Sequence, residues 1–295
     1  MQPPARWQIW LMLAPTLLLI GVLFFGGVGY ALLQSLGWNA QLGNESLSFA
    51  AYRALFTDPR YWPPIREGIQ LSLWTSVVST ALSAVLGVGL ALLLRGQFAG
   101  RGWGIFALQF SLPIPHMVTA AGMLFLLSSS GLVARGAAAL GWIQVPADFP
   151  ILVRDRYGIG IILTYIWKET PFITLVVLAA LEGIPPVYDE AAQTLGASWL
   201  NRLRYITLPL IAPSLGGACL LVLTFVFGAY EVPQLVGILF PRALPVKAVQ
   251  LFLDPDLNAR AEAMALSMLI ALVSLGFALG YVGWARRRGA SPHNR

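Results

Sequence analysis

Long apolar runs alternate with short polar segments along this chain. About 20 mostly apolar residues in a helix cross the ~30 Å hydrocarbon layer of a membrane. Six stretches meet that requirement, at residues 8–33, 69–94, 105–127, 158–181, 208–227 and 264–284. The pattern predicts an all-α, polytopic membrane protein with six transmembrane helices in a single domain, residues 1–295.

Prolines interrupt two of the six runs. Pro113 and Pro115 fall in the third, and Pro209 and Pro213 in the fifth. Such breaks are tolerated where neighbouring helices or a polar cavity satisfy the freed backbone groups. The first run is too long for the core of a signal peptide and no small-x-small cleavage site follows it, so we expect a retained first helix.

Composition agrees with a membrane protein. Hydrophobic residues make up 57% of the chain and charged residues 11%, against roughly 25% charged residues in soluble domains. The single cysteine, Cys219, lies inside the fifth run. A lone cysteine excludes an intramolecular disulfide framework.

The distribution of basic residues predicts the orientation. With six spans, both termini lie on the same side as the loops at 95–104 and 182–207. That side carries nine basic and three acidic residues, whereas the opposite loops carry nine of each and are nearly twice as long. Basic residues are enriched beside span ends on the cytoplasmic side. We therefore expect a multi-pass inner-membrane protein with cytoplasmic termini, whose net charge of +6 reflects topology and contact with lipid headgroups and needs no nucleic acid.

One polar stretch, at 187–207, has helical periodicity on the predicted cytoplasmic side. Its first part places apolar residues three and four positions apart, at Val187, Tyr188, Ala191, Ala192 and Leu195. Gly196 stands where a left-handed helix cap is wanted, Ser198 is suited to begin the next helix, and Pro209 opens the fifth span. The physics predicts two short amphipathic helices joined by a glycine turn. Periodicity alone is equally compatible with an interfacial helix lying among the headgroups.

The spacing of this stretch resembles a known family. Glu190-Ala191-Ala192, three residues, Gly196, nine residues and then Ile206-x-Leu208-Pro209 is similar, position by position, to the EAA loop of ABC importer permeases. The resemblance extends over nearly the whole chain through the six-span layout. It implies the type I ABC importer permease fold and the function of a non-catalytic inner-membrane subunit in binding-protein-dependent transport.

In that family the EAA loop docks into a cleft of the cytosolic ATPase. The resemblance therefore assigns ATPase coupling to Glu190, Ala191, Ala192, Gly196, Leu208 and Pro209. It also implies an ABC ATPase dimer, a second permease subunit and an extracytoplasmic solute-binding protein as partners. A heterodimer of permeases is expected, with a homodimer left open. ATP and Mg²⁺ would be bound by the ATPase and no cofactor by this chain.

Two shorter features indicate a branch of the family. The turn Thr194-Leu195-Gly196-Ala197-Ser198 looks like that of the polyamine, opine, phosphonate and ferric-iron group, not the Ile-Asp-Gly-Ala turn common in sugar permeases. The segments GAYEVPQLVG (228–237) and PRALPV (241–246) are similar to segments of spermidine/putrescine-type permeases. We expect a polyamine or a similar small cationic solute, with a sugar-type importer as the alternative.

Charged residues inside a span are candidates for the translocation path. Lys168 and Glu169 fall in the middle of the fourth run, where a charge costs about 2.5–3.5 kcal/mol on insertion scales. They either line the path or gate, or they form structural bonds to neighbouring helices. Phe227, Tyr230 and Glu231, where the fifth span ends, are candidates for a substrate gate, although importers of this kind take specificity chiefly from the binding protein.

Other chemistries find little support. His116 has no second histidine, cysteine or carboxylate at ligand spacing, which argues against a metal site. The phosphate-binding pattern G-x-x-x-x-G-K-[ST] is missing from the sequence. Two rivals from other classes remain: a secondary transporter driven by an ion gradient through Lys168 and Glu169, and a membrane scaffold that transports nothing. The secondary transporter leaves the EAA spacing unexplained, and the polar breaks in the spans argue against the scaffold.

Overall fold

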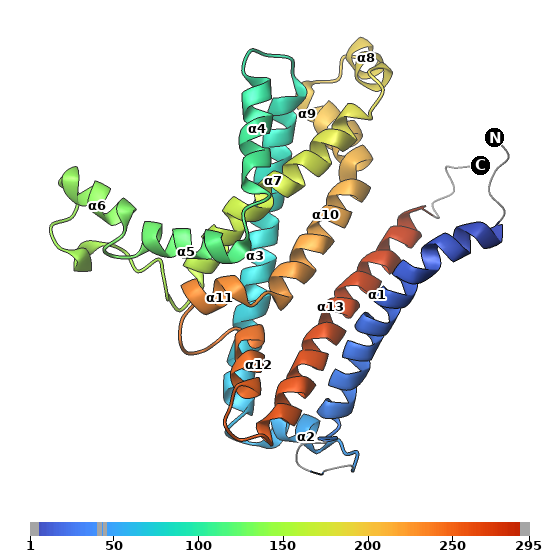
Figure 1. The fold of residues 1–295 in the computed structure, drawn as a ribbon. Helices are drawn as coiled ribbons and strands as arrows, with labels where there is room; N and C mark the ends of the chain where they lie inside the picture. The colour runs from blue at the N-terminus through green and yellow to red at the C-terminus, as the bar shows by residue number, and fades with distance from the viewer. Residues whose placement is uncertain (1–5, 40–42, 44–45, 290–295) are drawn as a thin grey trace. The chain divides into compact units, whose positions relative to one another are not determined.

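A computed structural model of the chain describes residues 6–39, 43 and 46–289. The regular structure of these residues is helical (Figure 1). In chain order the helices are α1 (Arg6–Ser35), α2 (Ala50–Thr57), α3 (Trp62–Arg95), α4 (Arg101–Ser111), α5 (His116–Leu127), α6 (Leu132–Ala139), η2 (Pro146–Asp148), α7 (Ile159–Glu182), α8 (Val187–Thr194), α9 (Trp199–Arg202), η3 (Leu203–Thr207), α10 (Leu208–Gly228), α11 (Glu231–Val236), α12 (Leu244–Phe252) and α13 (Ala259–Gly289).

The helices confirm most of the predicted spans. Six candidate membrane-crossing segments occur among the described residues. Five of them overlap the predicted runs to within a few residues: α1, α3, α7, α10 and α13 are continuous helices at those places. Helix α3 begins at Trp62, seven residues before the predicted start, because two prolines fit its first turn, where backbone N–H groups need no partner inside the helix.

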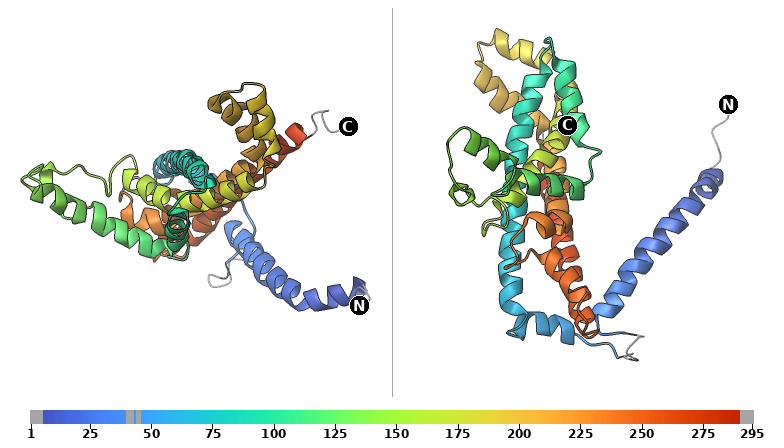
Figure 2. Two further views of the ribbon diagram at one scale, coloured as in Figure 1. Left: turned by 90° about the horizontal axis from the view of Figure 1, so that it is seen from above. Right: turned by 60° about the vertical axis from the view of Figure 1, so that its left-hand side comes forward.

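The third predicted span, 105–127, was wrong as one unit. It is divided between α4, which ends at Ser111, and α5, which begins at His116. Pro113 and Pro115 cause the break, because each removes a backbone donor and disfavours the helical conformation of the residue before it. The segment long and apolar enough to cross a membrane here is His116–Ala139, which comprises α5 and α6. In two different views α5 and α6 lead away from α4 (Figures 1 and 2).

The chain divides into two compact units, and the division falls within α3, α12 and α13. The larger unit, residues 66–246 and 270–295, is organised around α7. Tyr165, Ile173 and Val177 of this helix have no exposed surface. Helix α10 and the α4–α5 pair pack against α7, so α7 is the central helix of this unit.

Small residues bring helices of the larger unit close together. A Cβ added at Gly87 of α3 would lie 2.8 Å from Ile173 Cγ2 of α7. A Cβ at Gly216 of α10 would lie 2.7 Å from the ring of Tyr281 on α13, and the Tyr281 hydroxyl donates to the carbonyl of Pro213 at 2.8 Å. The glycines therefore set the spacing of the packed helices.

The smaller unit comprises residues 1–65 and 247–269. Within it the hydroxyls of Ser35, at the end of α1, and Tyr52 of α2 are hydrogen-bonded at 2.8 Å, and Leu55 of α2 is fully buried. The apolar window of α1 has no buried residue. Its side chains are therefore available to lipid or to another protein.

Candidate functional site

The EAA-like stretch folds into two short helices with a tight turn. Two residues after the end of α8, Gly196 has φ +78°, the left-handed conformation that glycine adopts without steric cost. The N–H of Gly196 donates to the carbonyl of Gln193 and that of Ala197 to the carbonyl of Ala192, both at 2.9 Å. These two bonds form a left-handed glycine cap. Ser198 then begins α9 by accepting the N–H of Asn201 at 3.3 Å.

Helix α9 continues without a break into the membrane-crossing helix. The π-helical segment η3 follows α9 directly, and α10 begins at Leu208 with Pro209 in its first turn. Leu208 and Pro209 are exposed. The α8–α9 pair is therefore joined to α10 by uninterrupted helical backbone.

Most of the predicted apolar face of α8 is exposed. Ala192 is buried, at 9% exposed, whereas Tyr188 is 50% and Leu195 87% exposed. Glu190 and Ala191 are exposed as well, and the Glu190 carboxylate forms no ion pair with the part of the chain that the structure describes. Large apolar side chains next to an unpaired carboxylate are typical of an interaction surface.

Two ion pairs surround the turn between α3 and α4, one to α8 and one to α7. Arg95, at the end of α3, lies 3.2 Å from Asp189 of α8. Arg101, at the start of α4, pairs with Glu182 at the end of α7 and also donates to the carbonyl of Leu94. Figures 1 and 2 show α8, α9 and the α3–α4 turn at the same end of this unit. Sequence analysis placed these basic residues on one side of the membrane but did not identify the pairs.

Lys168 forms an unusual contact in the middle of α7. Its side chain is buried, and its ammonium nitrogen lies 2.6, 3.0 and 2.7 Å from the carbonyl oxygens of Ser111, Leu112 and Ile114. The last carbonyls of a helix lack partners within it, and a proline-rich segment follows here. Lys168 therefore caps the end of α4 and holds the α4–α5 break against α7.

The neighbouring residue, Glu169, binds the other side of the same break. Its carboxylate lies 3.0 Å from Nε2 of His116, the first residue of α5. The His116 ring also packs against Phe225 of α10, with ring centroids 4.7 Å apart. The sequence does not indicate this contact of His116; among the described residues there is no group of His, Cys, Asp or Glu suited to hold a metal ion.

The other predicted path residues are dispersed. Phe227 is 1% exposed and packs edge to face on Phe277 of α13, with centroids 5.6 Å apart. Tyr230 and Glu231, by contrast, are partly exposed where α11 begins. Phe227 thus lies inside the helix packing of this chain, and only Tyr230 and Glu231 present surface.

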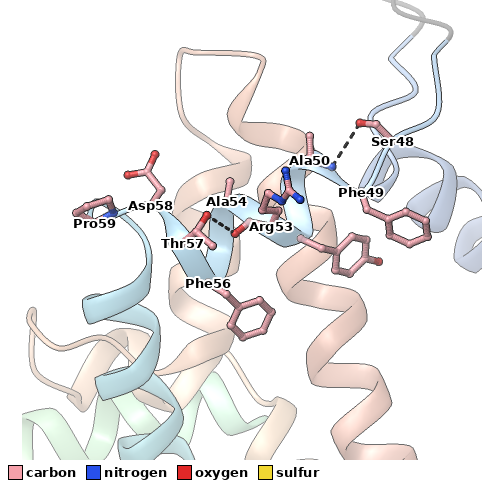
Figure 3. A pocket seen from close by; sticks show the side chains of 10 residues that line it. Ser48, Phe49, Ala50, Arg53, Ala54, Phe56, Thr57, Asp58 and Pro59 are labelled. Atoms are coloured by element: carbon pink, nitrogen blue, oxygen red, sulfur yellow. Dashed lines mark hydrogen bonds between the residues drawn. The ribbon is translucent and has the colours of Figure 1, made fainter.

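Hollows occur elsewhere on the chain. One, of about 970 Å³, is lined by residues 48–59 (Figure 3). All of its lining comes from α2 and the residues beside it, with Phe49 and Phe56 projecting from the helix near Arg53. It is a surface along a single helix and not a cleft between elements. A second hollow, at the start of α3, is built from separate segments and is considered below.

The fold has close relatives among solved transporters. The chain superimposes on a subunit of a bacterial ABC transporter that imports the acidic polysaccharide alginate, with a TM-score of 0.77 and 23% identity, covering 95% of this chain and 96% of that one. This likeness shows the all-helical permease fold.

Sequence comparison gives relatives of similar length. The chain is 29% identical over 238 residues to the inner membrane ABC transporter permease protein YdcU of Escherichia coli K12, covering 75% of this chain and 74% of that protein. It is 27% identical over 258 residues to the sulfoquinovosyl glycerol transport system permease protein SmoG of Agrobacterium fabrum, covering 78% and 77%.

A family model describes the same relationship over most of the chain. Its match covers residues 6–284, which include α8, α9, five of the six candidate spans in full and the sixth up to residue 284. The members are permease components of the inner membrane and not enzymes. The chain belongs to the family of binding-protein-dependent transport system inner membrane components.

Proposed function

We propose that the chain is a permease subunit of an ATP-driven importer and that α8 and α9 couple it to a cytosolic ATPase. The observation that carries this proposal is the exposed α8–α9 pair with its glycine cap, continuous with α10. Ala191 and Ala192 are small enough for α8 to lie deep in a groove of the ATPase. Glu190 is exposed and free to pair with a basic residue there.

Helices α8 and α9 and both termini lie on the cytoplasmic side of the membrane. An ABC ATPase dimer docks there and supplies the ATP and Mg²⁺ sites. A second permease chain, in a heterodimer, completes the path. An extracytoplasmic binding protein delivers the solute. Nucleotide binding then shifts the permease between two states with different affinity for these partners. The family name and the exposed surfaces of α1 and α8 support this assembly.

The solute is a sugar or sugar derivative. The polyamine prediction rested on short segments around residues 194–198, 228–237 and 241–246, and it is unsupported by the relatives whose names state a solute. The name of SmoG states a sugar derivative, which supports the alternative. Glu231, the acidic residue that favoured a cationic solute, is only partly exposed.

The experiment is a mild-detergent pull-down of the tagged chain from native membranes, with the retained proteins identified by mass spectrometry. Recovery of an ATPase, a second permease and a binding protein is expected. Glu190→Lys should lose the ATPase but still insert in the membrane. Asp254→Lys, an exposed acidic residue outside the coupling helices, should keep it. If crosslinked wild-type chain is recovered alone and still transports, an ion-gradient mechanism replaces this proposal.

A further inference from the structure

An open hollow of about 530 Å³ lies at the start of α3 in the larger unit. Its lining includes Arg66, Glu67, Gln70 and Trp74 of α3, and Arg156 and Tyr157 of the turn before α7. The hollow is on the opposite end of α3 from the coupling helices. The 22 residues from Trp74 to Arg95 span about 30 Å of helix, which is the thickness of the hydrocarbon layer.

The turn that carries Arg156 and Tyr157 is firmly held on α3. The Trp74 indole N–H donates to the carbonyl of Tyr157 at 3.0 Å. The buried carboxylate of Asp155 accepts the N–H groups of Tyr157 at 2.8 Å and Gly160 at 3.3 Å. Gly158 has φ +68°, and a Cβ there would lie 2.6 Å from a methyl of Thr75. The turn is therefore pre-organised.

Neighbouring segments are fixed in the same way. The Ser72 hydroxyl on α3 accepts the N–H of Leu244 at 2.9 Å, and a Cβ at Gly68 would lie 2.7 Å from the carbonyl oxygen of Arg242. Arg154 has φ +60°, a conformation that costs a residue with a side chain about 1–3 kcal/mol. Its N–H donates to the carbonyl of Val236 at 2.8 Å. Strain retained in a well-bonded frame is typical of functional sites.

The side chains displayed on this frame have a defined chemistry. Trp74 is 52% and Tyr157 67% exposed, and Arg66 and Arg156 are also exposed. Arginine binds carboxylate, sulfonate or phosphate groups through two parallel hydrogen bonds. Aromatic rings provide apolar faces on which a sugar ring can lie. Glu67 and Gln70 can accept hydrogen bonds from hydroxyl groups.

We propose that this hollow binds an acidic sugar, with Arg66 and Arg156 at its anionic group, Trp74 and Tyr157 against its ring and Glu67 at its hydroxyls. The inference rests on the proposed sugar-type function and narrows it to an anionic solute that is bound before it enters the path. A lipid phosphate would also attract the two arginines. A phosphodiester has no O–H on its phosphate to donate to Glu67, whereas an acidic sugar donates from its ring hydroxyls.

The test is saturation-transfer-difference NMR on the full chain in nanodiscs of phosphatidylcholine, with methyl glucuronide as the probe and methyl glucoside as its neutral counterpart. Methyl glucuronide should give a signal that saturates with concentration, and methyl glucoside should bind at least about tenfold more weakly, as for the loss of a hydrogen bond to a charged group. Trp74→Leu and the double variant Arg66→Gln/Arg156→Gln should each lose the signal. Arg53→Gln, an exposed arginine on α2, is the matched control.

Equal binding of the two glycosides, or a signal unchanged in the double variant, would overturn the proposal. Loss of the signal when phosphatidylglycerol replaces phosphatidylcholine would assign the hollow to lipid headgroups. Circular dichroism of each variant shows whether it is folded, and Arg66→Lys provides a milder change if the double variant is not. The pull-down tests the assembly separately, so recovery of all partners without glucuronide binding refutes the solute site alone.

Discussion

The ammonium nitrogen of Lys168 lies 2.6 Å from the carbonyl oxygen of Ser111, the last residue of α4. The same nitrogen also donates to the carbonyls of Leu112 and Ile114. Three backbone carbonyls therefore satisfy the buried ammonium group within the fourth span. Of the two readings that the sequence left open, the geometry favours the structural one. A lysine at this position secures a helix break that two prolines make unavoidable.

Replacing Lys168 tests that role. Lys168→Met should lower the free energy of unfolding by roughly 3 kcal/mol, because buried carbonyls lose their donor, and the thermal midpoint in detergent should fall by about 5 °C or more. Lys168→Arg should recover part of the loss. An unchanged midpoint in Lys168→Met, together with lost transport, would instead assign the lysine to the translocation path.

Helix α3 offers a matched pair of glycines. A Cβ at Gly87 would meet Ile173 at 2.8 Å and the backbone nitrogen of Thr174 at 3.2 Å, whereas nothing lies within 4 Å of a Cβ at Gly89. Gly87→Ala should therefore destabilise the protein by about 1–3 kcal/mol through overpacking. Gly89→Ala should be neutral or slightly stabilising, since alanine is the better helix former. The measurement is thermal unfolding of the two variants in the same detergent, and we expect a lower midpoint for Gly87→Ala. Equal midpoints would contradict the close contact of α3 with α7.

The turn between α8 and α9 depends on the backbone conformation of one residue. Gly196→Val places a branched side chain at φ +78°, which costs about 1–2 kcal/mol or more. We expect it to lose most ATPase retention in the pull-down while its level in the membrane is unchanged. Gly196→Asn should retain the ATPase, because asparagine tolerates the left-handed region. If valine is tolerated as well as asparagine, the cap has no part in coupling.

The Arg95–Asp189 pair is a surface contact, with side chains 29% and 28% exposed. Its contribution to stability should be small, about 0–1 kcal/mol, so Asp189→Arg should hardly change thermal unfolding. It should raise ATP hydrolysis per solute imported, because α8 is released from the α3–α4 turn. Import and hydrolysis are measured together in proteoliposomes, and the exchange Arg95→Asp/Asp189→Arg should restore the ratio. A ratio unaffected by the single variant would remove the pair from the coupling path.

Sequence reasoning succeeded where a local signal sufficed. Apolar run length located the spans, and the positions of Gly196 and Ser198 predicted the turn and the start of α9 correctly. It failed where partners come from distant parts of the chain. Nothing near Lys168 indicates the carbonyls of residues 111–114, and nothing near Phe227 indicates Phe277. The division of the third run could be read from Pro113 and Pro115, but its extension into α6 could not, because α6 has a weak apolar pattern and only the folded chain shows that it follows α5.

Lys168 and Glu169 are consecutive residues of α7, so their side chains leave the helix about 100° apart. Each binds a different side of one break, Lys168 the end of α4 and Glu169 the start of α5. Rotation of α7 about its own axis would break the contact of Lys168 with α4 and that of Glu169 with α5 together. A tilt of α7 would preserve both contacts if α4 and α5 moved with it. Two adjacent side chains of α7 thus tie both sides of one helix break to the same turn of this helix, so we expect any displacement of α7 to carry the end of α4 and the start of α5 with it.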